Sequence, residues 1–368
     1  MLMSEEKKSK IAFILGGLNY GGAERVASGM IRYWVQLRRP LAIISRRGPD
    51  NDFFEIPKNL ERYNLGGEGP SANKLVALLK NIPFVFRLRK AIKQSGAEVV
   101  VSFLTKTNIH TIMASFGLGI RVVISERNDT TRQQYPWPWP LLRKQLYRYA
   151  DVVTANSQIA LDGMAFYVPS EKLHLVENPV DFPEELAQPD QSNMILNVGR
   201  LVPQKAQHVL LEAFAGLPES RRDGWSCHFL GDGELYYSLK RLSAKLEVES
   251  SVVFHGLVKN PGDYYNKAGL FVLSSEFEGT PNVLLEAMAH GLPVIVSDSL
   301  PGALQFVSDG ENGFVFRSGD SPDLGEKMLQ LIGDPELRKQ FGKKSRAAVS
   351  RLSTYKVMKK WNRLTDFY

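Results

Sequence analysis

The chain has 368 residues, enough for two domains of ordinary size that each bury a core. Its hydrophobic content of 43% and charged content of 23% are those of a globular protein and exclude a disordered or membrane-spanning chain. The single cysteine excludes an intramolecular disulfide and indicates a reducing compartment such as the cytoplasm. The apolar run at residues 11–15 is too short for a signal peptide or a membrane span.

The positive charge is concentrated in the first half of the chain. Residues 1–180 contain 25 lysines and arginines against 15 aspartates and glutamates, whereas residues 181–368 contain 21 against 24. A basic half could bind nucleic acid, an anionic bilayer or a phosphorylated acceptor. No recognised nucleic-acid module accompanies the charge, which argues against nucleic acid. A solvated basic face without a ligand is an equal alternative.

Two segments of similar design begin the two halves. The first is a strand predicted at 11–15, a glycine-rich loop and a helix predicted at 23–36; the second is a strand at 194–198, a short loop and a helix at 205–217. A backbone without side chains can approach a phosphate or a sugar closely, although a tight turn explains the first loop equally well. Its glycines are Gly16, Gly17, Gly21 and Gly22.

Continuous apolar runs elsewhere predict further buried strands, with helical patterns between most of them. Buried strands that alternate with helices indicate parallel sheets covered on both faces. We therefore predict an α/β protein with two doubly wound sheets, divided near residues 178–189. Ligands of such sheets bind at the carboxyl ends of the strands, which predicts a cleft between the domains. The further strands are predicted at 41–45, 99–103, 122–125, 152–155, 227–230, 252–254, 270–273 and 294–297.

Residues 278–286 place two carboxylates eight residues apart across the start of a helix. We predict Thr280 as the N-cap and Pro281 as the first helical residue. The free N–H groups and the dipole of a helix start suit a phosphate, with Glu278 on the loop beside it and Glu286 inside the helix. Two hydroxyl-bearing rings joined by a diphosphate would match this arrangement. The alternative is a capped helix with two solvated glutamates.

A pair of cations follows the strand at 194–198. Arg200 offers a forked, permanently charged donor set and Lys205 a mobile point charge, which together suit a diphosphate. Gly231, in a Gly-Asp-Gly turn after another strand, could pass beneath a nucleoside or form a simple turn. Asp50 and Asp52 form a D-x-D that we interpret as a turn, so no metal site is predicted.

In order and spacing these motifs resemble the retaining glycosyltransferases of family 4, with the GT-B fold. The resemblance covers nearly the whole chain. It implies an acceptor-binding domain at 1–180, a nucleotide-sugar-binding domain at 181–352, and a helix at 353–368 that returns to the first domain. The motifs are the double-glycine loop, Val198–Leu201 with Lys205, Gly231–Gly233, Glu278–Val294 and Asp309–Gly313.

The resemblance also implies roles for individual residues, without a cofactor or a metal. Glu278 binds hydroxyls of the donor sugar, Glu286 binds the ribose, and Arg200 and Lys205 hold the diphosphate and stabilise it as leaving group. Backbone amides at three positions around the helix start would contact the phosphate or the sugar. These positions are Thr280, Asn282 and Val283.

One motif departs from the family. Many relatives carry a histidine late in the first domain where this chain has Arg127, preceded by Glu126. We keep both residues as catalytic candidates that could bind a phosphate or a sugar of the acceptor. Asn108 and His110 follow another strand of this domain, but a structural helix histidine is the better interpretation of His110.

The acceptor and the donor are less clearly indicated. Residues 135–144 combine two tryptophans, aliphatic residues and cations, a composition suited to a membrane interface. We therefore expect a peripheral protein on the inner face of a bacterial cytoplasmic membrane, acting on a lipid-linked saccharide, although a packed loop would have the same composition. The donor is expected to be a UDP-hexose or UDP-N-acetylhexosamine. Alternatives are GDP-mannose as donor, a GT-B nucleotide-sugar epimerase or phosphorylase, and a non-catalytic nucleotide-sugar-binding protein.

Overall fold

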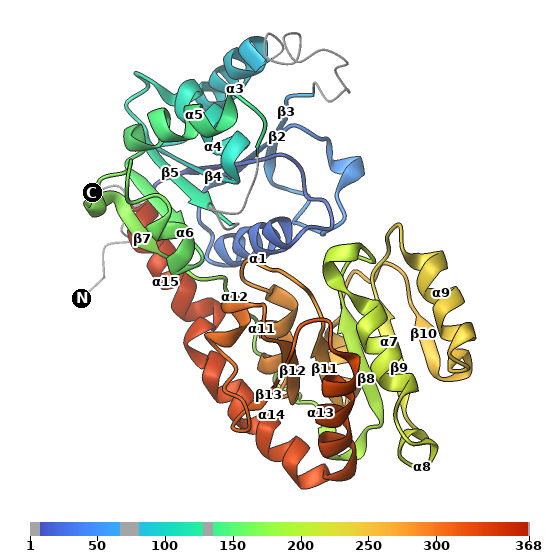
Figure 1. Cartoon of the computed structure of the whole chain (residues 1–368). Helices are drawn as coiled ribbons and strands as arrows, with labels where there is room; N and C mark the ends of the chain where they lie inside the picture. Colours follow the sequence, from blue (N-terminus) through green and yellow to red (C-terminus); the bar gives the residue numbers. More distant parts are fainter. Residues whose placement is uncertain (1–7, 67–80, 128–134, 367–368) are drawn as a thin grey trace, which may run out of the picture. The chain divides into compact units, whose positions relative to one another are not determined.

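The computed structural model describes residues 8–66, 81–127 and 135–366 (Figure 1). These residues form two compact units. The first contains residues up to 179 and from 355 onward, and the second contains residues 180–354. The chain thus leaves the first unit at 179–180, within the stretch where the sequence predicts a boundary, and returns to it at 354–355.

The first unit is built on a parallel sheet with helices on both faces. Among its described residues the sheet has seven strands in the order β3-β2-β1-β4-β5-β6-β7. The strands are β1 (Ile11–Leu15), β2 (Leu41–Ser45), β3 (Glu61–Asn64), β4 (Val99–Phe103), β5 (Arg121–Glu126), β6 (Val152–Ala155) and β7 (Leu173–Leu175). The helices are α1 (Gly22–Gln36), α3 (Asn81–Ser95), α4 (Thr105–Ser115), α5 (Trp139–Leu146), α6 (Gln158–Asp162) and α15 (Thr354–Thr365).

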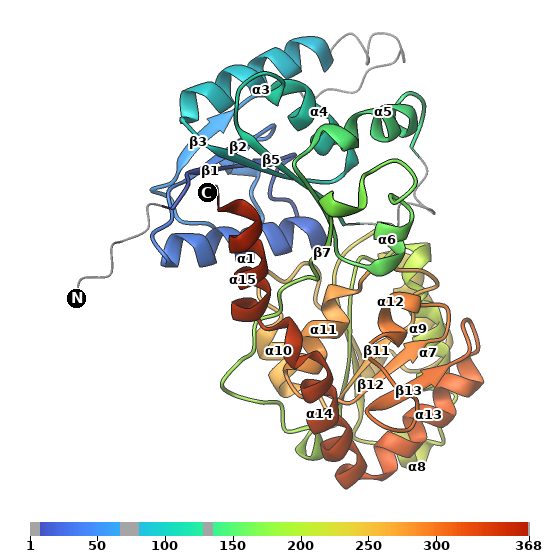
Figure 2. The same ribbon diagram turned by 90° about the vertical axis from the view of Figure 1, so that its left-hand side faces the viewer.

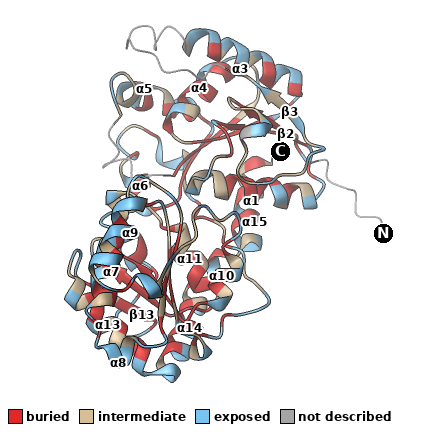
Figure 3. Ribbon diagram, turned by 90° about the vertical axis from the view of Figure 1, so that its right-hand side faces the viewer, coloured by how far each residue is buried: buried red, intermediate tan, exposed pale blue. Residues whose placement is uncertain are grey.

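Alternation along the strands places an apolar core on each face of this sheet. On β1, Ile11 and Phe13 belong to the core that includes α1 and α15, while Ala12 and Ile14 belong to the core that includes α3 and α4. Because both faces are covered, β1 is apolar throughout and β4 is apolar except for Ser102. Figure 3 shows the result, with buried residues along the strands and exposed residues on the outer sides of the helices.

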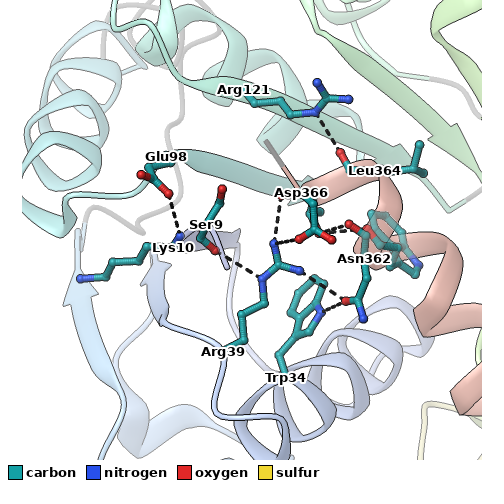
Figure 4. Close-up of polar contacts among 11 residues, drawn as sticks. Ser9, Lys10, Trp34, Arg39, Glu98, Arg121, Asn362, Leu364 and Asp366 are labelled. Atoms are coloured by element: carbon teal, nitrogen blue, oxygen red, sulfur yellow. Dashed lines mark hydrogen bonds and ion pairs between the residues drawn. The ribbon is translucent and has the colours of Figure 1, made fainter. Parts of the chain in front are cut away.

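Helix α15 belongs to the first unit although it is the last element of the chain (Figure 2). Trp361 is fully buried in the same core as Trp34 of α1. The Trp34 indole N–H and the Arg39 guanidinium both donate to Asn362 Oδ1, at 2.8 and 3.3 Å, and Arg39 pairs with Asp366 at 2.9 Å (Figure 4). Burial of aromatic surface and these charge-assisted bonds hold the helix in place.

The second unit has the same design. Within its described residues, six parallel strands lie in the order β10-β9-β8-β11-β12-β13. The strands are β8 (Met194–Val198), β9 (Ser226–Leu230), β10 (Val252–Phe254), β11 (Leu270–Leu273), β12 (Val294–Ser297) and β13 (Gly313–Phe316). The helices are α7 (Gln207–Ala215), α8 (Glu219–Arg222), α9 (Tyr236–Lys245), α10 (Gly262–Lys267), α11 (Asn282–Ala289), α12 (Pro301–Leu304), α13 (Ser321–Gly333) and α14 (Pro335–Val349).

The predicted fold class of two doubly wound α/β sheets is confirmed, as are the ten strands predicted from apolar runs. The sequence missed β3, β7 and β13, which are all edge strands. β3 and β7 are partly exposed and contain polar residues, so they lack the continuous apolar pattern of a central strand, whereas β13 is a largely buried Gly-Phe-Val-Phe segment. The helix predicted at 205–217 begins later, at Gln207, because Ala206 adopts a left-handed conformation with φ of 46°.

Candidate active site

Three loops of the second unit meet at the carboxyl edge of its sheet. They follow β8, β9 and β11, which are adjacent and parallel, so their carboxyl ends lie at the same edge. These loops contain five of the residues that the sequence analysis assigns to the donor, which are Arg200, Lys205, Gly231, Glu278 and Thr280. In an open parallel sheet this edge is where ligands bind.

Glycine allows two of these loops to touch. Gly231 has φ of 141°, and a Cβ at this position would overlap the carbonyl oxygen of Gly199 in the β8 loop. The Leu201 N–H donates to the Asp232 carbonyl at 3.0 Å, which holds the loops together. Gly231 therefore determines the backbone path at Gly199 and Arg200. This structural role holds whether or not Gly231 contacts a ligand.

Lys205 and Glu278 are brought together from the β8 and β11 loops. The Lys205 ammonium group pairs with Glu278 Oε1, and the buried Ser275 hydroxyl donates to the same oxygen at 3.0 Å. The side chains of Lys205 and Glu278 are 15% and 13% exposed, respectively. The pair is thus reachable from solvent but fixed by a buried hydroxyl, a contact that the sequence analysis missed because serine is common in loops.

Further bonds join the two loops. The Gln204 amide donates to the Phe277 carbonyl at 2.7 Å, and the Glu276 N–H donates to the Gln204 carbonyl at 2.9 Å. The Ser274 hydroxyl donates to the Lys205 carbonyl at 2.9 Å. The backbone on both sides of the Lys205–Glu278 pair is therefore fixed, which lowers the conformational entropy that ligand binding would otherwise remove.

Helix α11 begins one residue later than predicted. Its N-cap is Pro281 rather than Thr280, and its first residue is Asn282, followed by Val283. A proline before the helix has no N–H, so it is compatible with the cap position. The predicted glutamates occupy the loop and the fifth position of the helix, as the spacing indicates. A Cβ at Gly302 of α12 would overlap the Gly279 carbonyl, so this loop is also closely packed.

Glu286 is held from α10. The Tyr265 hydroxyl lies 3.1 Å from Glu286 Oε2 and 3.3 Å from the Val283 carbonyl oxygen. The Tyr265 ring is fully buried while Glu286 is half-buried. The phenol hydroxyl can therefore fix one carboxylate oxygen of Glu286 from the buried side. Tyr265 is a second residue that sequence analysis did not identify, because only tertiary packing places it under Glu286.

Arg200 differs from Lys205. Its side chain is exposed, and none of the hydrogen bonds or ion pairs found among the described residues uses its guanidinium group. Its carbonyl oxygen accepts from the Gln207 amide at 2.9 Å. The backbone at this position is therefore anchored while the cation remains available to an anion.

The glycine-rich loop of the first unit joins β1 to α1. Gly21 is the N-cap of α1 and Gly22 its first residue. A Cβ at Gly17 would approach the side chain of Arg47 to 3.2 Å, whereas one at Gly16 would meet no atom within 4 Å. Arg47, which follows β2, thus lies against this loop and adds a cation to which the sequence analysis assigned no specific role.

Glu126 is fully buried at the end of β5. One carboxylate oxygen accepts from the hydroxyls of Thr105, at 2.7 Å, and Tyr147. The Asn108 amide donates to the same Tyr147 oxygen at 3.2 Å. Burial raises the pKa of Glu126, while the hydroxyl donors and the charge of Arg143 oppose that rise. The residue therefore lies in a polar network inside the unit rather than on its surface.

Arg127 is also buried. Its guanidinium lies 4.0 Å from the ring centroid of Phe103 and 5.6 Å from that of Trp361, and one nitrogen donates to Asn178 Oδ1 at 2.5 Å. Burial lowers its pKa to about 9. These contacts tie β5 to α15 through cation–π packing. Any contact of Arg127 with an acceptor would require this arrangement to open.

His110 and the D-x-D occupy structural positions. The His110 ring packs edge-on against Phe84 and Trp139, at 5.0 and 5.3 Å between centroids, and burial lowers its pKa to about 3. Asp52 forms an ion pair with Arg62 at 2.6 Å. Within residues 8–66, 81–127 and 135–366 there is no group of three or more His, Cys, Asp or Glu side chains arranged to hold a metal ion.

The tryptophan-rich segment is only partly available to a surface. Trp137 is 73% exposed and Leu141 is 51% exposed, and Lys144 is exposed. Trp139 packs on His110, and Arg143 is buried, so these two do not point to solvent. In the part of the chain that the structure describes, no helix has both the length and the apolar character needed to span a bilayer.

The chain matches two families of known proteins. The family of group 1 glycosyl transferases matches residues 181–348, and Glycosyltransferase Family 4 matches residues 20–183. The chain also shares its fold with HepE of Anabaena, solved in complex with UDP and glucose: the TM-score is 0.80 at 18% identity, over 96% of this chain and 98% of that one. Two parallel-sheet units of this kind define the GT-B glycosyltransferases.

Two Campylobacter jejuni proteins are similar over their whole length. One, named GalNAc-alpha-(1->4)-GalNAc-alpha-(1->3)-diNAcBac-PP-undecaprenol alpha-1,4-N-acetyl-D-galactosaminyltransferase, is 27% identical over 96% of this chain and 98% of its own. The other, named N-acetylgalactosamine-N,N'-diacetylbacillosaminyl-diphospho-undecaprenol 4-alpha-N-acetylgalactosaminyltransferase, is 27% identical over 95% and 97%. The present chain belongs to the family 4 glycosyltransferases and is a hexosyltransferase.

Proposed function

We propose that the protein transfers a hexose or an N-acetylhexosamine from a UDP-linked donor to a lipid-linked saccharide, with retention of configuration and without a metal ion. The observation that carries this proposal is the Lys205–Glu278 pair, fixed by Ser275 at the carboxyl edge of the second sheet. It places a cation for a phosphate beside a carboxylate for sugar hydroxyls. The start of α11 follows in the same loop.

The donor would be held at three points. Arg200, Lys205 and the N–H groups at the start of α11 bind the diphosphate. Glu278 accepts hydrogen bonds from the sugar hydroxyls, and Glu286, oriented by Tyr265, accepts them from the ribose. Because Lys205 contacts Glu278 directly, a phosphate that binds this lysine lies next to the carboxylate that selects the sugar.

In the transfer step the bond from the anomeric carbon to the diphosphate oxygen breaks, and a bond to the acceptor hydroxyl oxygen forms on the same face. The hydroxyl proton passes to the departing phosphate. Negative charge accumulates on the diphosphate, so the fixed cations stabilise the transition state more than the bound donor. NMR of the product tests retention, since inversion at the anomeric carbon would rule out this step.

The acceptor class rests on the relatives. Both Campylobacter proteins are named for acceptors on undecaprenyl diphosphate, and a Salmonella relative of 24% identity is named a lipopolysaccharide 1,6-galactosyltransferase. We therefore place this chain in the synthesis of a bacterial lipid-linked oligosaccharide or lipopolysaccharide. Assays with such acceptors would identify the saccharide that the protein extends.

A lipid-linked acceptor requires access to a membrane surface. Trp137 and Leu141 offer apolar surface and Lys144 offers a cation for anionic headgroups on the first unit. Arg143 is buried, so Lys144 is the residue to vary. Lys144→Glu with Trp137→Ser should lower co-sedimentation with anionic liposomes at low salt, whereas His208→Gln, on the second unit, should not. Unchanged sedimentation would reject this docking surface.

A donor screen tests the proposal as a whole. UDP-, GDP- and ADP-sugars are added to the full chain and the midpoint of thermal unfolding is measured, because a ligand of the native state raises it. Glu286→Ala should abolish the shift, and Glu276→Ala, which removes an exposed carboxylate of the loop that precedes α11, should preserve it. A shift with GDP-mannose alone would favour a mannosyltransferase. Release of UDP without an acceptor would favour an epimerase, and binding without turnover with any acceptor would favour a binding protein.

A further inference from the structure

Two histidines face each other near the edge of the second sheet that β10 forms. His228 lies on β9, and His255 follows β10, which is the edge strand. Val253 pairs with His228, so His255, two residues further, points to the same face of the sheet. His228 Nδ1 lies 3.0 Å from His255 Nε2, and both rings are half-buried.

The outer nitrogens of the two rings also have partners. His228 Nε2 lies 3.0 Å from the Ser226 hydroxyl, and His255 Nδ1 lies 3.3 Å from the Tyr264 hydroxyl. When a hydroxyl accepts from the outer N–H of an imidazole, it fixes the tautomer and leaves a lone pair on the inner nitrogen. Metal-binding histidines are generally oriented in this way by an acceptor on the far nitrogen.

The distance between the inner nitrogens suits an ion. Zn–N bonds of about 2.1 Å in a tetrahedral site place two ligand nitrogens about 3.4 Å apart. The imidazoles thus need to separate by only a few tenths of an ångström. Because both rings reach solvent, water can complete the coordination. Burial lowers the pKa of both histidines, and the neighbouring His255 lowers that of His228 further.

We propose that His228 and His255 bind a divalent transition-metal ion such as Zn²⁺, with Ser226 and Tyr264 orienting the two ligands. Imidazole is a preferred ligand for this class of ion. Neither histidine is among the residues assigned to the donor, and the proposal does not depend on the donor or the acceptor.

The position of the site gives it a consequence for the fold. Gly231 follows β9 and Gly256 follows β10, and the Gly231 N–H donates to the Gly256 carbonyl at 2.8 Å. A metal ion between His228 and His255 would join these strand ends just before the loop that packs on Gly199. Metal binding should therefore stabilise the edge of the sheet in the native state.

Calorimetric titration of the full chain, without a polyhistidine tag, with Zn²⁺ at pH 7 tests the proposal. Wild-type protein and the control His208→Gln, an exposed histidine of α7, should bind one ion each. His228→Gln and His255→Gln should each lose this binding. Zn²⁺ should also raise the midpoint of thermal unfolding of the wild type and of His208→Gln, but not that of His228→Gln or His255→Gln.

Two further variants keep both imidazoles in case a glutamine disturbs the strands. Ser226→Ala and Tyr264→Phe should each weaken Zn²⁺ binding by on the order of tenfold, the usual effect of losing an orienting partner. The proposal is overturned if the wild type binds no Zn²⁺, since the contact is then a hydrogen bond between neutral rings only. It is equally overturned if His228→Gln and His255→Gln bind as the wild type does.

Discussion

Replacement of Ser275 by alanine should weaken binding of the donor sugar without weakening binding of the nucleotide. The Ser275 hydroxyl is fully buried and donates at 3.0 Å to Glu278 Oε1, the oxygen that also pairs with Lys205. The substitution removes this donor and leaves the ion pair in place. Glu278 then loses the contact that fixes its orientation toward a sugar hydroxyl.

The expected magnitude follows from the charge and exposure of the acceptor. A hydrogen bond to a charged group contributes about 1.5–3 kcal/mol. Glu278 is 13% exposed and keeps Lys205, so water and the ammonium group replace part of the loss and the lower value applies. A change of about 1.4 kcal/mol corresponds to a tenfold rise in Kd.

Ser274→Ala is the matched control. The Ser274 hydroxyl is equally buried but donates to a neutral carbonyl, that of Lys205, at 2.9 Å. Calorimetry should show a tenfold weaker Kd for the UDP-sugar with Ser275→Ala, an unchanged Kd for UDP, and a smaller effect of Ser274→Ala on both. Urea unfolding should report similar stabilities for the two variants. Equal weakening of UDP and UDP-sugar by Ser275→Ala would refute the assigned role of Glu278.

Three other changes test the fold of the two units. Gly231→Ala should lower the unfolding free energy by about 2 kcal/mol, because the new Cβ overlaps the Gly199 carbonyl at a φ that alanine avoids; an unchanged urea midpoint would contradict this. Asn362→Ala should lower it by about 2 kcal/mol, since two largely buried donors lose their acceptor, and thermal unfolding like that of the wild type would exclude this anchor for α15. The neutral, buried His110 should make stability fall as pH drops from 6.5 toward about 3, because only the unfolded chain binds the proton there. Relative to His110→Gln the slope should approach 1.4 kcal/mol per pH unit, roughly the free energy of one pKa unit, and parallel curves for the two proteins would show that His110 ionises in the folded state.

Much of the architecture followed from local pattern. Strands such as 11–15 and 270–273 are apolar throughout because helices cover both faces of the sheets, so a short apolar run predicts them directly. The spacing of Glu278 and Glu286 across a helix start fits two solvated residues as well, and the order of the surrounding motifs, through the family resemblance, assigned them to the donor. The sequence predicts Pro281 as the first residue of α11, whereas the structure has it as the N-cap. Helix ends commonly differ by one or two residues between assignments, so local sequence does not determine this position.

The alternation of apolar runs with helical patterns determined that this chain forms two parallel sheets. The order of the motifs along the chain indicated which loops carry cations and carboxylates. Only the tertiary structure decided which side chains meet. Lys205 contacts Glu278 from the β8 loop and Tyr265 contacts Glu286 from α10, Glu126 is enclosed by hydroxyls, and His228 faces His255 across neighbouring strands. Contacts of this kind depend on strand order and register, which are set by packing of the whole sheet rather than by any local run of residues.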